Sequence, residues 1–324
     1  MEHKPAETTP NGAPSVSTFT LVAMAVPPLL WAGNFIVGRA VRNDVSPFAL
    51  VFTRHMLAFL CLLPFCWWHL TREASQYWRA RWFLLRTSLS GMVLFNVLIY
   101  FGLHTTNATN ALLFNSAIPV LIVVFSLLLF QQRTSLKQLA GLTLSMAGVL
   151  AIVGRGQWDA LLHMELSSGD CLVLAGVASF ALYSIWLREL PAGLHRLSVV
   201  CAQFLVATVL LLPAFVWDTA SGDAISWSWS NAAAIAYVAV GSSVVATVFY
   251  AASVRRLGAG QASLSIHLIP VFGAFMSALL LDEAIHFYHW LGMLMILSGL
   301  AFATLRLPTW SGHQTPPIAP RQAD

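Results

Sequence analysis

The chain has 324 residues, of which 58% are hydrophobic and only 9% are charged, and its formal net charge is +4. A soluble domain usually has about a quarter of its residues charged, so this composition excludes a soluble protein and predicts a polytopic α-helical membrane protein. Alternating segments of about ten residues are absent, which argues against a transmembrane barrel, and the basic residues form no patch that would indicate a nucleic-acid partner.

Ten segments are apolar over roughly the 18 residues that a membrane-spanning helix needs. We expect these spans near residues 19–40, 47–68, 81–103, 108–130, 135–154, 168–188, 197–217, 231–251, 260–281 and 286–306. The polar tails, residues 1–18 and 307–324, are predicted to be disordered. Tryptophans at the edges of the longest connections indicate the aromatic belt of a membrane interface: Trp67, Trp68, Trp78, Trp82, Trp217, Trp227 and Trp229.

Lys and Arg predict the orientation, because short loops that carry them stay in the cytoplasm. They gather in alternate connections, as Arg72, Arg79, Arg81, Arg133, Lys137, Arg188, Arg196, Arg255 and Arg256. The other connections hold Arg42 and Arg155 and are otherwise acidic, with Asp44, Asp159, Glu165, Asp218, Asp223, Asp282 and Glu283. Because the alternation holds across all the spans, we predict that both tails are cytoplasmic and that the membrane is a bacterial inner membrane.

The second half of the chain repeats the first. Three residues of one apolar hairpin recur 151 positions later: Pro119, Gly141 and Gly148 become Pro270, Gly292 and Gly299. Trp31 and Phe180 begin similar segments 149 residues apart. We therefore expect one repeat over residues 19–154 and another over 168–306, each with five spans. Five is odd, so the second repeat crosses the membrane in the opposite sense, a plan that is typical of transporters.

These residues resemble a known family. The run Trp31-Ala32-Gly33-Asn34-Phe35, the opening of the second span from Ser46 to Arg54, and the two proline hairpins are similar to the drug/metabolite transporter superfamily. The segment Leu279-Leu280-Leu281-Asp282-Glu283, followed by Gly292 and Gly299, resembles the most recognisable motif of its ten-span EamA-type branch. The first half departs from that motif with Gln131-Gln132. The resemblance covers residues 20–306 and implies membrane transport, without specifying the substrate.

Polar side chains inside the spans are costly, so each needs a partner or a cavity. Arg54 could attract a substrate carboxylate or could stabilise the bundle by bonding a helix end, and both readings stay open. Asn34, Asn96 and Asn115 could bond across helices or line a cavity. Because they lie on three helices of one half, a shared polar lining is expected. His267 could bind substrate, carry a proton or bond a neighbouring helix.

Aromatic residues and prolines complete the predicted site. Trp31, Tyr100 and Tyr183 are candidates for the wall of a central cavity, with ordinary packing as the alternative. Pro119 and Pro270 each remove a helix hydrogen bond and are expected to act as gating hinges. The sequence has no motif of a hydrolase or nucleotide-binding loop. Its four cysteines have no Cys-x-x-Cys spacing, so we expect no catalytic residue, cofactor or metal site.

The sequence thus predicts a secondary transporter that exports small organic metabolites, such as amino acids, by alternating access. Its partners would be the substrate, the lipid bilayer and, if transport is coupled to them, protons; an exchanger and a uniporter stay open. We expect a monomer, with a dimer as the alternative. A phosphate-bearing or nucleotide-sugar antiporter is a competing hypothesis, but it needs cationic residues in the cavity. An intramembrane enzyme and a membrane scaffold are alternatives of another class.

Overall fold

The computed structural model describes residues 18–106, 108–132, 134–157, 167–191, 193–222, 225–281 and 285–304. Within these ranges every regular element is a helix, and strand-like pairing is limited to an isolated antiparallel bridge between Val45 and Ile225. The polar tails, Asp282 and Glu283 lie outside the described residues.

The first half of the chain begins with two long helices and continues with shorter pieces that join end to end. Its elements are α1 (Thr18–Ala40), α2 (Pro47–Arg72), α3 (Ala74–Arg79), α4 (Arg81–Thr87), the π-helix η1 (Ser88–Leu94), α5 (Phe95–Thr105), α6 (Ala108–Asn115), α7 (Ile118–Phe130) and α8 (Leu136–Val153).

The second half follows the same plan. Its elements are α10 (Ser168–Trp186), the 3₁₀-helix η2 (Leu187–Glu189), α11 (Arg196–Ala220), α12 (Trp229–Tyr237), the π-helix η3 (Val238–Val245), α13 (Ala246–Leu257), α14 (Ala259–Leu264), the 3₁₀-helix η4 (Ser265–His267), α15 (Leu268–Leu281) and α16 (Phe287–Thr304).

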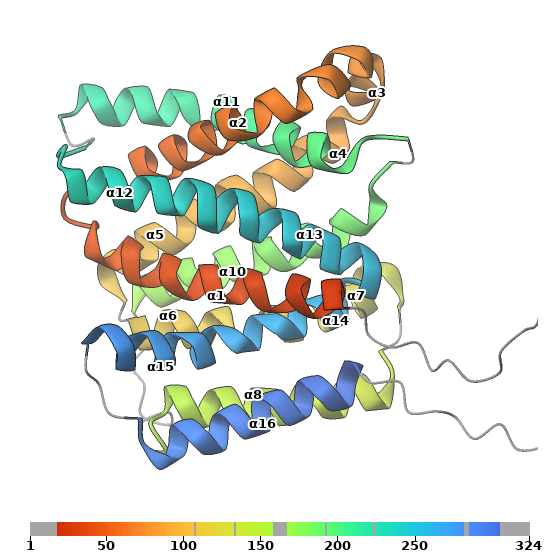
Figure 1. The fold of residues 1–324 in the computed structure, drawn as a ribbon, viewed down its shortest axis with the longest axis vertical. Helices are drawn as coiled ribbons and strands as arrows, with labels where there is room; N and C mark the ends of the chain where they lie inside the picture. The colour runs from red at the N-terminus through yellow and green to blue at the C-terminus, as the bar shows by residue number, and fades with distance from the viewer. Residues whose placement is uncertain are drawn as a thin grey trace, which may run out of the picture.

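Among the described residues, nine helical stretches are long and apolar enough to cross a membrane. A further apolar helix, Phe287–Ala303, corresponds to the tenth predicted span but is shorter than the others. The axes of the long helices are roughly aligned, and successive long helices cross the bundle in opposite directions (Figure 1). The first helix, α1, begins at the end of the bundle where α16 finishes. The prediction of an all-α, polytopic membrane protein is confirmed.

Serine side chains define where several spans begin. Ser46 precedes Pro47 and accepts a hydrogen bond from the Ala49 N–H, so side chain and proline together start α2. Ser167 and Asp170 form a reciprocal capping box at the start of α10. These caps satisfy N–H groups that would otherwise be left without partners at the helix ends.

Interruptions occur at equivalent places in the two halves. The π-helices η1 and η3 lie inside the third and eighth spans, and their first residues, Ser88 and Val238, are 150 positions apart. The fourth and ninth spans are each broken, between α6 and α7 and between α14 and α15. Pro119 and Pro270 lie in the first turns of α7 and α15, where a missing N–H leaves no helix hydrogen bond unmade.

The last helices of the two halves, α8 and α16, pack closely through glycine. A Cβ atom at Gly148 would lie 2.6 Å from the Gly292 carbonyl oxygen, and one at Gly141 would lie 2.6 Å from that of Gly299. Glycine therefore lets the two backbones approach at both positions. The two helices pack antiparallel, so that Gly141 faces Gly299 and Gly148 faces Gly292. In the repeat, Gly292 is the equivalent of Gly141 and Gly299 is the equivalent of Gly148. This exchange is what a twofold relation between the halves requires.

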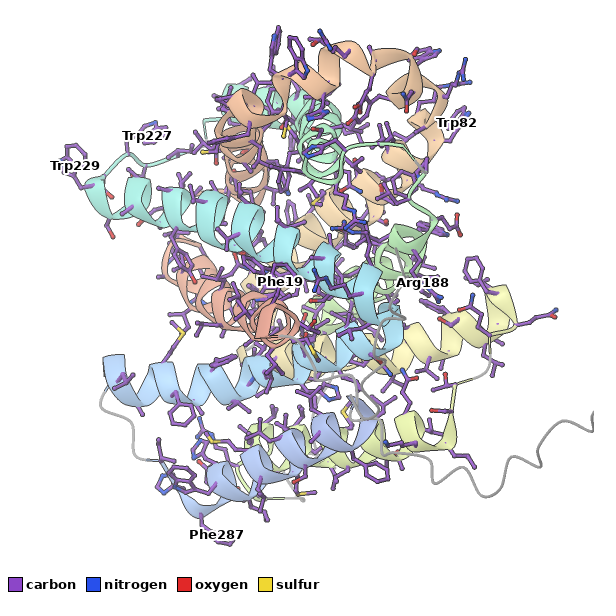
Figure 2. All side chains as sticks on the ribbon, turned by 45° about the vertical axis from the view of Figure 1, so that its right-hand side comes forward. Phe19, Trp82, Arg188, Trp227, Trp229 and Phe287 are labelled. Carbon is purple, nitrogen blue, oxygen red and sulfur yellow. The ribbon has the colours of Figure 1, made fainter. Side chains whose placement is uncertain are left out.

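Large apolar side chains cover the outside of the bundle, as expected for a surface that faces lipid. The tryptophans that the sequence places at the membrane interface are exposed, from Trp68 at 59% to Trp229 at 93%. Figure 2 shows Trp82 and Arg188 toward one end of the bundle and Trp227 and Trp229 at the other. The aromatic belt thus has members at both ends.

Candidate functional site

Arg54 is the centre of a buried polar cluster. It projects from α2, is only 3% exposed, and donates hydrogen bonds to five neutral oxygen acceptors. The acceptors and their donor–acceptor distances are Ser243 Oγ (2.8 Å), Asn34 Oδ1 (3.3 Å), Asn96 Oδ1 (2.8 Å), Tyr100 OH (2.8 Å) and Ser242 Oγ (3.1 Å). No described carboxylate pairs with it. A buried cation with neutral partners only is a strong attractor for an anion.

The cluster keeps hydrogen-bond donors free. Each Nη atom of an arginine carries two hydrogens, and Nη2 of Arg54 has one acceptor among the described residues, Ser242 Oγ. That hydroxyl accepts from Arg54 and has no described acceptor for its own hydrogen. An Arg54 N–H and the Ser242 O–H therefore remain available side by side, which is the arrangement that a carboxylate accepts through two oxygens.

The π-helix η3 brings the two serines to Arg54. Ser243 Oγ donates to the carbonyl oxygen of Val238, five residues earlier, at 3.0 Å. Trp31 on α1 donates from Nε1 to the Ser242 carbonyl oxygen at 3.2 Å. The wider turn of a π-helix leaves such carbonyls free for side-chain donors, and π-helical segments are frequent at functional sites.

A small cavity of about 30 Å³ adjoins the Arg54 cluster. Its walls come from α1, α2, α5, α10, η3 and both broken spans: Trp31, Asn34, Phe35, Arg54, Phe95, Asn96, Ile99, Asn115, Ile118, Phe180, Ser242, Ile266 and Ile269. The breaks themselves reach the wall, since Asn115 and Ile118 flank one and Ile266 and Ile269 flank the other. Irregular backbone within a membrane occurs where it lines such a cavity.

A second cavity, also of about 30 Å³, shares Trp31, Arg54, Asn96 and Ser242 with the first. Its further walls include Tyr183 and Tyr250. The Trp31 ring lies 5.6 Å from the Phe180 ring and 5.3 Å from the Tyr250 ring, measured between centroids. Edge-to-face and tilted arrangements of this kind stabilise aromatic pairs, so the rings form a packed aromatic wall.

The structure brings most of the predicted site residues together. Trp31, Asn34, Arg54, Asn96 and Asn115 line the first cavity, and Tyr183 lines the second. Tyr100 lines neither cavity.

Tyr100 makes two hydrogen bonds within the Arg54 cluster. Its hydroxyl accepts from Arg54 and donates to Asn34 Oδ1 at 2.9 Å. Pro119 and Pro270 follow cavity-lining residues, Ile118 and Ile269, but do not line the cavity themselves. Their role as hinges stays a prediction.

Asn115 differs from the other asparagines. It is 2% exposed and lines the first cavity, yet its side chain makes no hydrogen bond with any described residue. Its amide is therefore free to bond a ligand.

His267 lies outside both cavities and is fully buried. Its Nε2 faces the Ser116 carbonyl oxygen at 3.0 Å, and its Nδ1 faces Ser145 Oγ at 2.6 Å. A carbonyl oxygen only accepts, so Nε2 is the donor, and both ring nitrogens have partners. The hydrogen bond from His267 to Ser116 therefore connects the two broken spans.

Sequence reasoning missed three polar residues of the site. Ser242 and Ser243 were not among the predicted site residues. The repeat does not indicate them, because Met92 and Val93 occupy the equivalent places 150 residues earlier. His55 lines the second cavity and is 1% exposed. Its Nδ1 donates to the Val51 carbonyl oxygen at 2.7 Å, and Nε2 has no described partner. Its position directly after Arg54 was the available signal.

No group of three or more His, Cys, Asp or Glu side chains suited to a metal occurs among the residues that the structure describes. The linings of the two central cavities, as far as they are described, include no Asp or Glu. The arrangement can thus bind and orient an anion through Arg54.

The fold and the site define a polytopic membrane protein with a buried polar cavity between two similar halves. The sequence profile of the EamA-like transporter family matches residues 18–154 and 167–305. The chain belongs to this family of membrane transporters, and the resemblance noted from the sequence is confirmed. The profile matches twice, once in each half.

Curated relatives are similar along most of the chain. A protein named "Uncharacterized transporter" from Archaeoglobus fulgidus is 24% identical over 89% of this chain and 98% of its own. A "Probable amino-acid metabolite efflux pump" from Escherichia coli is 24% identical over 84% of this chain and 90% of its own. An "Uncharacterized inner membrane transporter YicL" from Salmonella typhimurium is also 24% identical, over 86% and 92%.

A solved crystal structure shares the fold. It aligns with a TM-score of 0.70 and 19% identity, and covers 90% of this chain and 97% of its own. Together these comparisons identify a multi-pass membrane transporter whose substrate class is a small molecule.

Proposed function

We propose that this protein exports small metabolites that carry a carboxylate, amino acids among them, across a bacterial inner membrane. The carboxylate would bond the free N–H of Arg54 and the hydroxyl of Ser242, and Asn115 would bond a second polar group of the substrate. The name of the Escherichia coli relative, an amino-acid metabolite efflux pump, supports this choice of substrate class.

The observation that carries the proposal is the charge balance at Arg54. A guanidinium that is 3% exposed and has only neutral described partners retains an unneutralised charge in the interior. A purely structural arginine would be expected to pair with a carboxylate or to reach the interface. A bound carboxylate would supply the negatively charged partner that Arg54 lacks. Each charge-assisted hydrogen bond to it would contribute about 1.5–3 kcal/mol to the binding free energy.

Transport would proceed by alternating access. Each central cavity has a volume of about 30 Å³, room for about two water molecules. Small-molecule sites usually measure about 300–1,000 Å³, so the substrate can enter only when the two halves move apart. Repeats that cross the membrane in opposite senses provide such a motion by rocking about a central site.

The test is a flux screen in sealed proteoliposomes, with amino acids first. We expect saturable flux for a carboxylate-bearing solute, and a KM at least about tenfold higher in Arg54→Gln, since that variant loses one charge-assisted bond. Arg79→Gln is the matched control, because Arg79 is an exposed arginine outside the cavity. Equal flux in Arg54→Gln and wild type would refute the role of Arg54. Absence of flux for every carboxylate tested would refute the substrate class.

The same vesicles test proton coupling with and without an imposed pH gradient. His55 is the described titratable histidine with an unpartnered nitrogen at the cavity wall. Flux that follows the gradient in wild type and ignores it in His55→Gln would identify His55 as the proton carrier. Flux that ignores the gradient in both would indicate a uniporter or an exchanger.

A further inference from the structure

Four arginines line a cavity at the end of the bundle where α1 begins and α16 finishes. This cavity has a volume of about 690 Å³ and lies between the end of α10, the start of α11 and the end of α13. Arg188, Arg196, Arg255 and Arg256 all line it. We call it the arginine vestibule. Arg188 marks that end of the bundle in Figure 2.

The charges in the arginine vestibule are not neutralised by the described part of the chain. No acidic residue lines the cavity, and none of the four arginines pairs with a described carboxylate. The nearest acid along the chain, Glu189, is engaged by Arg86 instead. Arg255 feels the like charges of both Arg196 and Arg256. Mutual repulsion makes this grouping costly unless an anion binds.

Arg255 carries a further sign of an incomplete site. Its Nε is buried and has no hydrogen-bond partner among the described residues. A buried donor without an acceptor costs about 1–3 kcal/mol, and a ligand oxygen would remove that cost. Arginine presents donors in a planar fork that matches the oxygens of phosphate and carboxylate groups, so the chemistry of the vestibule points to an oxyanion.

A neighbouring cavity of about 200 Å³ extends the site. It shares Arg188, Leu257 and Gly258 with the arginine vestibule. Its remaining polar walls include the amides of Gln132, Gln138 and Gln261. Arg188 donates to Gln132 Oε1 at 2.6 Å, which ties the two cavities together. Amides bond hydroxyl and carbonyl groups, so this side suits the uncharged part of a ligand.

We propose that the arginine vestibule is a binding site for a polyvalent oxyanion, a molecule with two or more clustered phosphate or carboxylate groups. The volume lies within the range of small-molecule sites, and several separated guanidinium groups match several charges on one ligand. The site is distinct from the Arg54 cavities, which share none of its lining residues. It therefore stands whether or not Arg54 binds a carboxylate.

The position of the vestibule gives the bound anion an effect on the transporter. Val254, which lines the vestibule, lies one helical turn beyond Tyr250, which lines the second central cavity. An anion held by Arg188, Arg196 and Arg255 would join the ends of α10, α11 and α13, next to the aromatic wall of the central cavity.

The test uses the purified full chain in nanodiscs of phosphatidylcholine, titrated with pyrophosphate and, separately, with citrate by calorimetry. We expect saturable binding that weakens steeply as NaCl is raised, because the contacts are ionic. Arg196→Gln/Arg255→Gln should weaken it at least tenfold. Arg79→Gln/Arg81→Gln is the control pair. It removes two positive charges at the same end of the bundle but outside the cavity, and its affinity for the anion should stay within about twofold of the wild-type value.

Two results would overturn the proposal. One is the absence of saturable binding of either anion to the wild-type protein at low salt. The other is an equal loss of affinity in the control pair, which would indicate a general surface charge effect. If the Arg255 variant is not monodisperse, Arg188→Gln/Arg196→Gln changes two exposed side chains and gives the same test.

A second arm identifies the source of the oxyanion. Nanodiscs that contain cardiolipin present a lipid with two phosphate groups at the same end of the protein. Loss of pyrophosphate binding in these nanodiscs, restored when phosphatidylcholine replaces the anionic lipid, would support the site and assign it to a lipid headgroup. Unchanged binding would support the site and assign it to a soluble anion.

Discussion

Arg54 and Gln203 occupy equivalent places in the two halves, 149 residues apart, the same offset as Trp31 and Phe180. Both side chains are buried. Gln203 donates to Thr87 Oγ1 at 2.8 Å, and its Oε1 has no described partner. One half thus places a charge near the centre of the molecule and the other a neutral amide. The two halves share a fold, but the central cation that we propose binds the substrate carboxylate belongs to the first half.

The asparagines near Arg54 divide into partnered and unpartnered side chains, and their substitutions should differ accordingly. Asn96 accepts from Arg54 and donates to the Met92 carbonyl oxygen at 2.7 Å. Asn96→Ala should therefore lower the free energy of unfolding by about 1–3 kcal/mol, the cost of leaving a charged donor without its acceptor. Asn115→Ala breaks no described hydrogen bond and should change stability by about 0.5 kcal/mol or less.

Asn115→Ala should affect transport although it leaves stability unchanged. Asn115→Ala should raise the KM of the identified substrate about tenfold while leaving the thermal unfolding midpoint in place. Thermal unfolding in detergent and flux in proteoliposomes supply the two measurements. A normal KM in Asn115→Ala would remove that residue from the binding site, and a lowered midpoint would show that it has a structural partner.

At the scale of elements, four interruptions converge on one region. The two broken spans and η3 contribute to the wall of the first cavity, and residues of η1, Gly91 and Met92, line the second. In the interior of an uninterrupted helix, the backbone N–H and C=O groups are all used in hydrogen bonds within that helix. A break or a π-turn frees carbonyl and N–H groups, and these cavities are the places where the membrane interior can accommodate them.

The α8–α16 contact gives a prediction about glycine. A Cβ at Gly148 would lie 2.6 Å from the Gly292 carbonyl oxygen and 2.9 Å from Ile296 Cγ1. Gly148→Ala should therefore force the helices apart and lower the free energy of unfolding by about 1–3 kcal/mol. Gly273 in α15 is the matched control, because a Cβ there meets nothing within 4 Å. Gly273→Ala should be neutral or stabilising by about 0.5–1 kcal/mol. Equal midpoints for both variants would contradict this packing.

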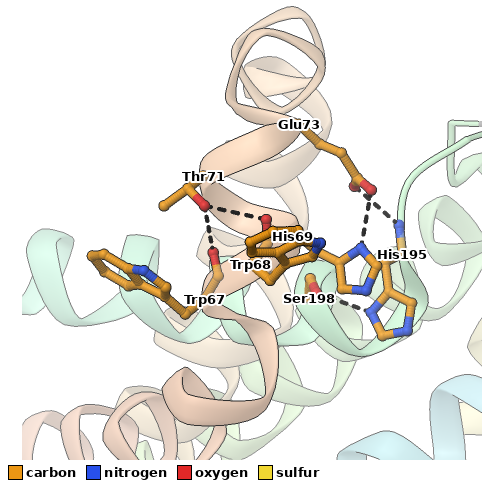
Figure 3. Close-up of polar contacts among 7 residues, drawn as sticks. All are labelled: Trp67, Trp68, His69, Thr71, Glu73, His195 and Ser198. Carbon is orange, nitrogen blue, oxygen red and sulfur yellow. Dashed lines mark hydrogen bonds and ion pairs between the residues drawn. The ribbon is translucent and has the colours of Figure 1, made fainter.

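The helix pair α2 and α11 is joined at one end by a polar cluster (Figure 3). His69 Nδ1 lies 3.1 Å from Glu73 Oε1, and the His69 and His195 rings stack with centroids 4.0 Å apart. The His69 hydrogen bond lowers the pKa of Glu73. Burial and the neighbouring His69 ring lower the pKa of His195.

Both shifts predict a loss of stability in acid. A His195 with a lowered pKa stays neutral in the fold, so the unfolded chain takes up a proton first as pH falls below about 6.5. Glu73 then loses its contribution as pH falls below about 4.3. The His195 effect should amount to a few tenths of a kcal/mol, because the residue is exposed. His195 is at the N-cap position of α11 and makes no side-chain cap bond there, whereas asparagine is a favourable N-cap residue. His195→Asn should flatten the decline of the unfolding midpoint between pH 6.5 and 5. Parallel pH profiles would refute this assignment.

At the scale of the whole molecule, hydropathy and the repeat predicted the helical class, the spans and the pairs of equivalent residues. They did so because lipid imposes length and apolarity on each span. Two of the partners of Arg54, Ser242 and Ser243, could not be predicted, because they lie 188 and 189 residues away along the chain. The π-turn that presents them has no sequence signal in Val238-Ala239-Val240-Gly241. The arginine vestibule was read as an orientation signal, because a charge count says nothing about which loops share a cavity.

The end of the bundle opposite the arginine vestibule holds the two halves together through loops. Val45, between α1 and α2, forms an antiparallel bridge with Ile225, between α11 and α12. Next to it, the Ser226 N–H donates to the Asp44 carbonyl oxygen at 2.7 Å, and Ser46 donates to Asp218. If transport proceeds by the proposed alternating access, we expect these contacts to separate in each cycle, because they join the two halves at the predicted outer end.

A cross-link across this bridge should therefore stop transport. Opposed residues of an antiparallel pair have Cα atoms about 4.5–5.5 Å apart, within the range that a disulfide spans. In a variant whose four native cysteines are replaced by serine or alanine, Val45→Cys/Ile225→Cys should lose flux after mild oxidation and regain it with a thiol reductant. The single variants should keep their flux under both treatments. Full flux in quantitatively cross-linked protein would show that this end stays closed throughout transport, and would eliminate alternating access through it.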